Sequence, residues 1–245
     1  MSARATDRSS FDGLARFAGA MYLLQMAAGL FTQLHARGSL YVADSPIGTA
    51  ANIAGSEQLF RIGIGADVIC YLAVLLATWA LYVLLRTVDQ NLAVLAVMFR
   101  LVELALHLGA TVASLAALRL LRGGPSLASF DAAERGELAQ FAIAMQGTSV
   151  NLGFVLLGLG SAVFACLLLR SGYVPRALAV LGIVGSALLA TYAGVWIVVP
   201  DVMRLQYIPM LPMGLYEVGL GLWLLARGVS HRIPVSPRQR SAARP

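Results

Sequence analysis

The chain has 245 residues, of which 59% are hydrophobic and 12% charged, and its mean hydropathy is +0.77. A soluble domain carries roughly a quarter charged residues, so this composition excludes an ordinary soluble protein. The formal net charge of +6 comes from arginines alone, without a lysine, and most of them lie at the ends of apolar runs or in the tails. That placement indicates membrane topology and excludes a nucleic-acid groove, so no nucleic-acid partner is expected.

The first apolar run, at 17–36, follows a polar segment and has no small-residue cleavage site, which favours a retained helix over a signal peptide. Further runs lie at about 62–85, 92–118, 144–169, 177–199 and 208–226. Each reaches the ~18 residues that a membrane span needs. The sequence therefore predicts an all-α transmembrane bundle of about six spans at 16–228, between a polar N-terminal tail, 1–15, and a basic C-terminal tail, 229–245.

The loops predict an orientation. Eleven arginines fall on the side of both termini and six on the other, so we expect the termini in the cytoplasm and the protein in the plasma or inner membrane of the cell, with the lipid bilayer as its partner. The outer loop at 120–143 ends in the amphipathic DAAERGELAQFAIAM, which is expected to begin the fourth helix. The short inner connections RTVDQN and RSGYVPR predict antiparallel neighbours.

The run at 92–118 carries three ionisable residues, Arg100, Glu103 and His107. Their spacing of i, i+3 and i+7 places them on one helical face. A charge at mid-bilayer costs roughly 2.5–3.5 kcal/mol even on a lenient insertion scale. This face is therefore expected to point into the protein or toward water.

Two more acids lie inside apolar runs, Asp67 in IGIGADVICY and Glu217 in MGLYEVGLGLW. At ~1.5 Å per residue, Glu103 and Glu217 both lie about 15–17 Å from the inner helix ends, His107 about 22 Å and Asp67 about 28 Å. The two glutamates and Arg100 are thus predicted to share the membrane midplane, below a second polar layer. The candidates for that outer layer are Gln25, Asp67, His107, Gln146, Asn151, Tyr192 and Trp196.

Acids in a shielded cavity suit proton exchange, which makes Glu103, Glu217 and Arg100 candidate catalytic residues. Asp67, His107, Gln146, Asn151, Tyr192 and Trp196 are candidates for binding a substrate. Glu103 and His107 form only one i, i+4 pair, so neither a metal nor another cofactor is expected. Small residues in GFVLLGLGSA at 153–162 are interpreted as helix-packing positions.

Three functions remain open on this reasoning. The first is a membrane-embedded binding protein or enzyme for a lipophilic small molecule, which would exchange a proton with it. The second is a small transporter or proton-coupled permease that uses the same residues as a relay. The third is a structural or regulatory membrane protein in which Arg100 forms an ion pair that holds the bundle together. The oligomeric state also stays open.

Several segments together resemble a known family. They are ARFAGAMYLLQMAAGLF, ANIAGSEQLFRIGIGADVICYLAVLLATWALYVLLR, FRLVE, LLLRSGYVPRALAVLGIVGSALL and MGLYEVGLGLWLLARG. From about residue 14 to 228 the chain is similar to the bacterial membrane family catalogued as domain of unknown function 4386. The polar positions that match are Glu57, Arg61, Asp67, Arg100, Glu103, Pro175 and Glu217. The resemblance implies an integral membrane bundle of six or so helices and no particular activity, and it does not extend to His107.

Overall fold

The computed structural model of the protein describes residues 2–42, 45–199, 202 and 207–229. These residues are almost entirely helical and include no strand. Six helices are long and apolar enough to cross a membrane, which confirms the predicted all-α multi-span fold. In chain order the elements are α1 (Ser2–Phe31), the π-helix η1 (Thr32–Arg37), α2 (Gly38–Leu40), α3 (Pro46–Gly55), α4 (Glu57–Leu85), α5 (Gln90–Arg122), the 3₁₀ turn η2 (Pro125–Leu127), α6 (Ala132–Ser171), α7 (Arg176–Val198) and α8 (Tyr207–Arg227).

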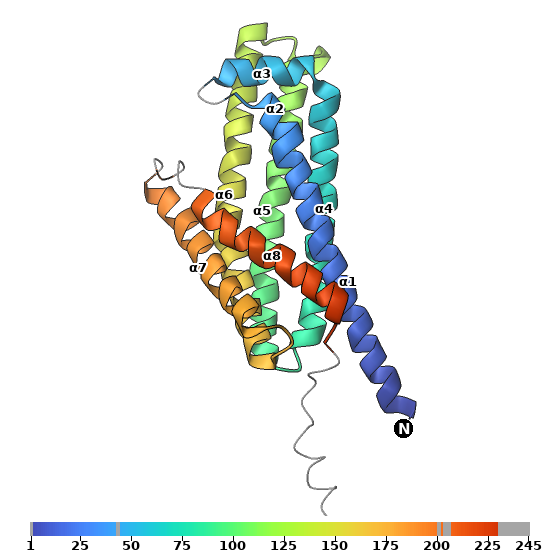
Figure 1. The fold of residues 1–245 in the computed structure, drawn as a ribbon. Coiled ribbons are helices and arrows are strands. Elements are labelled where there is room, and N and C mark those ends of the chain that lie inside the picture. Colours follow the sequence, from blue (N-terminus) through green and yellow to red (C-terminus); the bar gives the residue numbers. More distant parts are fainter. Residues whose placement is uncertain (1, 43–44, 200–201, 203–206, 230–245) are drawn as a thin grey trace, which may run out of the picture.

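The six long helices form a closed ring. Each packs against the next along the chain, and α8 returns to pack against α1 (Figure 1). The predicted antiparallel neighbours, α4 with α5 and α6 with α7, are both in contact. At the end of the ring, the backbone N–H of Val229 donates to Asp12 Oδ1 over 2.8 Å, so the start of α1 and the end of α8 lie on one side of the bundle. That this side faces the cytoplasm stays a prediction.

Several helices run beyond the predicted spans. The segment predicted as a polar tail belongs to α1, which begins at Ser2, whereas the basic tail from residue 230 onward lies outside the described residues. The amphipathic stretch does begin the fourth long helix, because Asp131 and Glu134 form a capping box at the start of α6. With 40 residues, α6 is about 60 Å long, twice the ~30 Å of a bilayer's hydrocarbon core.

The short helix α3 lies across the end of the bundle opposite the start of α1 and the end of α8 (Figure 1). Ser45 caps it by accepting a 3.1 Å hydrogen bond from the N–H of Gly48. Ile53 of α3 is buried in one apolar cluster with Phe60 of α4 and Leu118 of α5. The connection between the first two spans therefore includes a packed helix, α3.

The half of the ring that contains the start of α1 and the end of α8, here called the packed half, holds the largest apolar core. Glycines bring its helices into near contact. A Cβ at Gly158 of α6 would lie 2.5 Å from the carbonyl oxygen of Ser186 on α7, and one at Gly182 of α7 would lie 2.4 Å from the ring of Tyr216 on α8. Small residues thus pack these helices, as membrane interfaces require.

Candidate functional site

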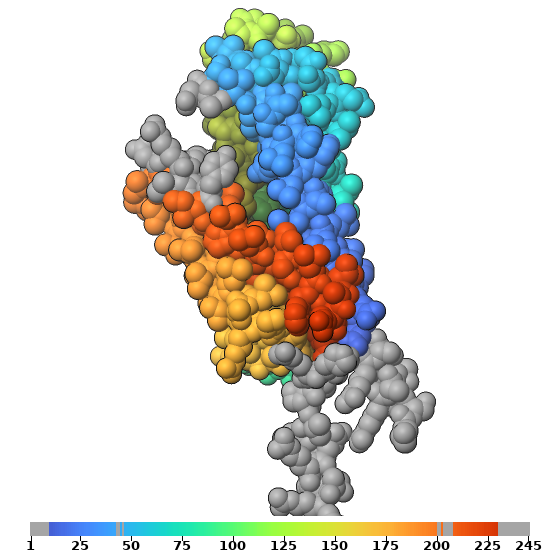
Figure 2. Space-filling model, in the orientation of Figure 1, coloured from blue at the N-terminus to red at the C-terminus, as the bar shows by residue number. Residues whose placement is uncertain are grey.

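The opposite half of the ring, here called the cavity half, encloses a cavity of about 230 Å³. Its walls come from α1 with η1, α4, α5, α6 and α8, while none of its lining residues belongs to α7. Figure 2 shows the surface hollowed between α1 and α6, just beyond the crossing of α8, with α5 at the base of the hollow. The polar lining residues are Gln25, Gln33, Arg37, Asp67, Tyr71, Arg100, Glu103, His107 and Glu217.

The three ionisable residues of α5 lie together, as their spacing predicts. Arg100 Nη1 is 2.9 Å from Glu103 Oε2, and His107 Nδ1 is 3.4 Å from Glu103 Oε1. The contact between Arg100 and Glu103 is an ion pair but not an aligned hydrogen bond. Neither Arg100 Nη1 nor Glu103 Oε2 has a hydrogen-bond partner among the described residues. Both side chains are only 3% exposed, so water cannot screen their charges. Arg100 and Glu103 therefore offset each other's charge in the interior.

Glycines of α6 make room for these side chains. A Cβ at Gly153 would lie 2.6 Å from His107 Nε2, and one at Gly160 would lie 3.1 Å from Arg100 Cδ. The stretch GFVLLGLGSA, interpreted from the sequence as helix packing alone, therefore also accommodates the ionisable face of α5. Larger residues at either position would displace a group that lines the cavity.

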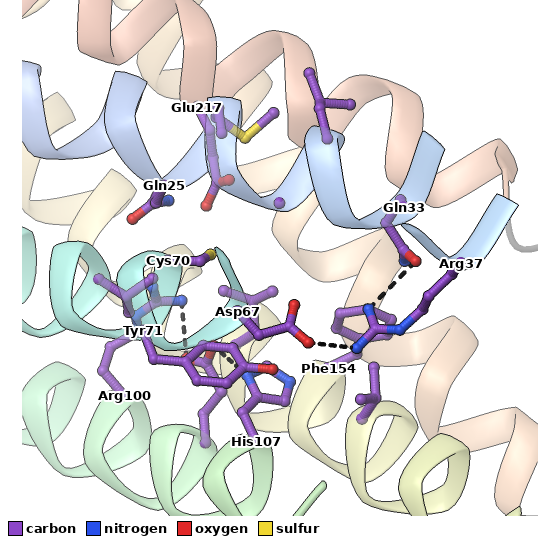
Figure 3. A pocket seen from close by; sticks show the side chains of 17 residues that line it. Gln25, Gln33, Arg37, Asp67, Cys70, Tyr71, Arg100, His107, Phe154 and Glu217 are labelled. Carbon is purple, nitrogen blue, oxygen red and sulfur yellow. Dashed lines mark hydrogen bonds and ion pairs between the residues drawn. The ribbon is translucent and has the colours of Figure 1, made fainter. Parts of the chain in front are cut away.

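Glu217 reaches the same cavity from α8 and is 8% exposed. Among the residues that the structure describes, no arginine or histidine lies within ion-pair distance of its carboxylate. Its electrostatic neighbours are Arg100 and the amide of Gln25, which lies close to the carboxylate in Figure 3. Gln25 Oε1 is buried and has no hydrogen-bond partner in the described part of the chain. The deep end of the cavity thus holds one acid without a cation.

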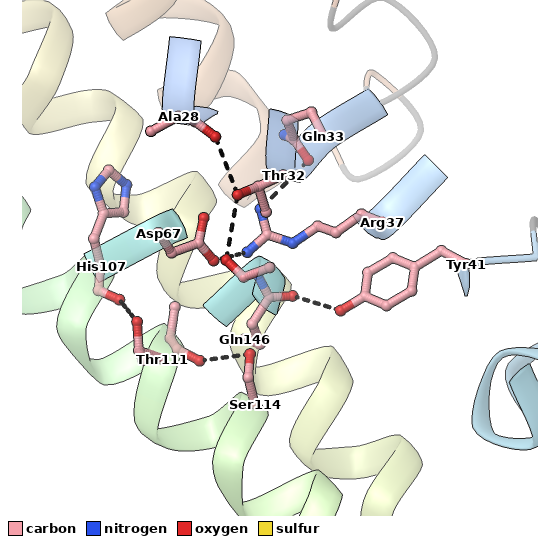
Figure 4. Close-up of polar contacts among 12 residues, drawn as sticks. Ala28, Thr32, Gln33, Arg37, Tyr41, Asp67, His107, Thr111, Ser114 and Gln146 are labelled. Carbon is pink, nitrogen blue, oxygen red and sulfur yellow. Dashed lines mark hydrogen bonds and ion pairs between the residues drawn. The ribbon is translucent and has the colours of Figure 1, made fainter. Parts of the chain in front are cut away.

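Asp67 lies in a second polar group, and its partner is Arg37, one residue beyond the end of the first predicted apolar run. Arg37 Nη2 is 2.6 Å from Asp67 Oδ2, and Arg37 Nη1 is 3.4 Å from Gln33 Oε1 (Figures 3 and 4). The first helix does not end at residue 36 as predicted but continues through η1. A sequence signal exists, because Gln25, Gln33 and Arg37 recur at multiples of four along an apolar helix.

Two aromatic residues that the sequence analysis did not single out complete the lining around His107. The ring of Tyr71 on α4 stacks on the imidazole with centroids 5.4 Å apart, and Phe154 on α6 meets it edge-on at 6.1 Å. The imidazole is therefore held on three sides, by these two rings and by Glu103.

Four predicted binding residues do not line the cavity. Asn151 Nδ2 donates to the carbonyl of Gly147 within its own helix over 3.1 Å, and Tyr192 and Trp196 lie on α7. Gln146 accepts a long hydrogen bond of 3.5 Å from the hydroxyl of Tyr41, whose pKa is raised by burial (Figure 4). Helix lengths give depth in the membrane but not the direction in which a side chain points, which is why the sequence could not tell that these four lie away from this cavity. A role for them in binding stays a prediction.

The cavity offers carboxylates, two guanidiniums and one imidazole to a ligand. Among the described residues no group of three or more His, Cys, Asp or Glu side chains could hold a metal ion. What the arrangement can do chemically is pair with a polar head group, donate or accept a proton, and surround an apolar chain with the side chains of Met26, Leu30, Val74, Val150 and Leu157.

Comparison with known proteins gives a family but no activity. No curated protein and no solved structure matches the chain. The model of one family, described as Domain of unknown function (DUF4386), matches residues 17–228, which reach into all six candidate spans and include every ionisable residue of the cavity. The chain is therefore a multi-span membrane protein that belongs to the DUF4386 family.

Proposed function

We propose that the protein binds or processes a lipophilic small molecule in this cavity and exchanges a proton with it. The observation that carries the proposal is Glu217, a buried carboxylate without a paired cation, beside an apolar wall. A buried charge is costly unless it is paired, so an unpaired acid at a cavity is a group ready to interact with a ligand.

The other ionisable residues have roles that follow from their contacts. Arg100 pairs with Glu103, and the same carboxylate reaches His107, so Glu103 is already engaged. This leaves Glu217 as the group that exchanges a proton with the ligand. The Arg37–Asp67 pair borders the same cavity nearer the end of the bundle, where it would contact the ligand on its way in.

The position of the opening supports a ligand that comes from lipid. The hollow lies on the side of the bundle, between α1 and α6, rather than at one of its ends (Figure 2). In a membrane such an opening faces the acyl chains, so an apolar molecule would enter without crossing water. We place the protein in the plasma or inner membrane with both termini in the cytoplasm, as its arginine distribution predicts.

A cavity-filling variant tests the proposal. A Cβ at Gly29, on the cavity wall, meets only Cys70 Sγ at 3.8 Å, so Gly29→Leu would extend into the cavity without striking backbone. Gly65 on α4 is exposed and has nothing within 4 Å of a built Cβ, which makes Gly65→Leu a matched control. Mass spectrometry of the purified proteins should find a co-purified amphiphile with the unchanged chain and the control but not with Gly29→Leu. The same small molecules in all three would refute the proposal.

A proton-coupled permease is a second candidate, since ionisable groups line the cavity at two depths, Arg37 with Asp67 and Glu103 with Glu217. Proton uptake into proteoliposomes, driven by the co-purified molecule and lost in Glu217→Gln, would favour transport over binding alone. The third possibility, a purely structural ion pair, predicts that Glu217→Gln changes neither binding nor uptake.

A further inference from the structure

We infer that the cavity takes the ammonium head group of a single-chain lipophilic amine, held by Glu217 and Gln25. The inference rests on the proposed function and names the chemical class of its ligand. Three features carry it, namely the charge balance of the lining residues, their unused hydrogen-bond acceptors, and the size and opening of the cavity.

With the three carboxyl groups ionised and the imidazole neutral, the lining residues carry one negative charge in excess. They include two guanidiniums, on Arg37 and Arg100, against three carboxylates, on Asp67, Glu103 and Glu217. Each guanidinium is used in its own ion pair, at 2.6 Å with Asp67 and 2.9 Å with Glu103. The imidazole of His107 contacts Glu103 and not Glu217. A cationic ligand would therefore supply the one charge that the cavity lacks.

One of the unused hydrogen-bonding atoms near Glu217 is an acceptor. Gln25 Oε1 is buried without a partner among the described residues, and the Gln25 side chain lies beside the carboxylate of Glu217 (Figure 3). A primary ammonium brings three N–H donors and a positive charge, so it can satisfy both groups at once. An alcohol brings one donor and no charge. A carboxylate would add a second anion next to Glu217.

The volume fits a head group and the beginning of its chain. A cavity of about 230 Å³ holds roughly eight heavy atoms at ~30 Å³ each. Beyond that length, a single acyl chain would leave through the opening between α1 and α6 into lipid, along Met26 and Leu30.

Three probes that share one chain length test the head group directly. Dodecylamine, dodecanol and dodecanoate would be titrated into the full-length protein in lipid nanodiscs at neutral pH, with bound copies counted by native mass spectrometry and empty nanodiscs as the background. We expect dodecylamine to bind at least about tenfold more tightly than dodecanol, and dodecanoate to bind least. Equal binding of the three, or preference for dodecanoate, would overturn the inference.

Glu217→Gln keeps the shape of the side chain and removes its charge. We expect it to lower dodecylamine affinity by about tenfold or more and to leave dodecanol affinity within about twofold. Glu137→Gln, at an exposed position of α6, is the matched control and should change neither. Should Glu217→Gln fail to fold, Gln25→Leu removes the acceptor oxygen instead and should weaken dodecylamine more than dodecanol.

The outcomes separate this inference from the proposed function. If all three probes bind and Gly29→Leu blocks them, but Glu217→Gln keeps the wild-type ranking, the cavity binds lipophilic molecules and the amine assignment is wrong. If none of the probes binds to any of the proteins, both the amine assignment and the binding function fall.

Discussion

The two halves of the helical ring are held together in different ways. In the packed half, glycines such as Gly158 and Gly182 let helices approach until a single added carbon would overlap the neighbour. In the cavity half, helices of the same ring enclose charged groups and about 230 Å³ of open volume. Because lipid provides no hydrophobic drive between helices, close contacts such as those of α6 with α7 are what hold the ring around an open, charged site.

The largest effect is expected in the cavity half, from Arg100→Met. It leaves Glu103 buried without a cation, and breaking a buried pair in this way costs about 3–5 kcal/mol of unfolding free energy. Denaturation in detergent micelles would measure it. The double variant Arg100→Met with Glu103→Met removes both charges and should recover most of the loss. If Arg100→Met were as stable as the unchanged chain, this pair would contribute nothing to the stability of the cavity half.

A pair of identical substitutions compares the two halves directly. Gly182→Ala, in the packed half, brings a Cβ to 2.4 Å from the Tyr216 ring, and overpacking of this kind costs about 1–3 kcal/mol. Gly29→Ala, on the cavity wall, meets only Cys70 Sγ at 3.8 Å and should change stability by less than about 0.5 kcal/mol. Thermal unfolding of both variants in one detergent gives the answer. Equal losses would abolish the distinction between the halves.

The closure of the ring in the packed half depends in part on Asp12. Its carboxylate accepts a 2.8 Å hydrogen bond from the N–H of Val229, after the end of α8. Asp12→Ala should therefore cost about 1 kcal/mol, the net value of one such bond. Hydrogen exchange at the end of α8 would locate the effect, which should be absent from the residues around the cavity.

The smallest effect is expected outside both halves, at Arg61. Arg61 pairs with Glu57 over 2.6 Å, and its side chain is 44% exposed. Arg122 also pairs with Glu57, over 2.7 Å. Solvent and salt screen exposed pairs, so Arg61→Gln should lower the unfolding free energy less than Asp12→Ala does. A loss as large as that of Arg100→Met would mean that surface pairs, rather than the buried one, support the cavity half.

The fold was largely predictable because length and apolarity alone decide which segments cross a bilayer. All six spans follow from the apolar runs, and the i, i+3, i+7 pattern on α5 predicts correctly that Arg100, Glu103 and His107 lie together. The rise per residue also predicts a similar depth for Glu103 and Glu217, and both residues line one cavity. These are properties of single helices, which a sequence contains in full.

The rest of the site depends on how helices are rotated against each other. Gln146 and Tyr192 lie in spans as predicted but away from the cavity lining, because rotation about the helix axis does not follow from helix length. The fit of Gly153 against His107 is likewise a relation between two helices. Arg37 was missed for a different reason, which is that the helix carrying it continues past the point where the apolar run ends.

The π-helical turn η1 sets the direction in which Arg37 points. A π-helix closes its bonds from i to i+5, so such a turn takes up an extra residue without rotating the helix that follows. Winding the six residues Thr32–Arg37 as regular α-helix would rotate everything after them by about 100° around the axis. Arg37 would then turn away from Asp67 although neither side chain of the pair had changed, so this contact depends on the wider turn as much as on its two residues.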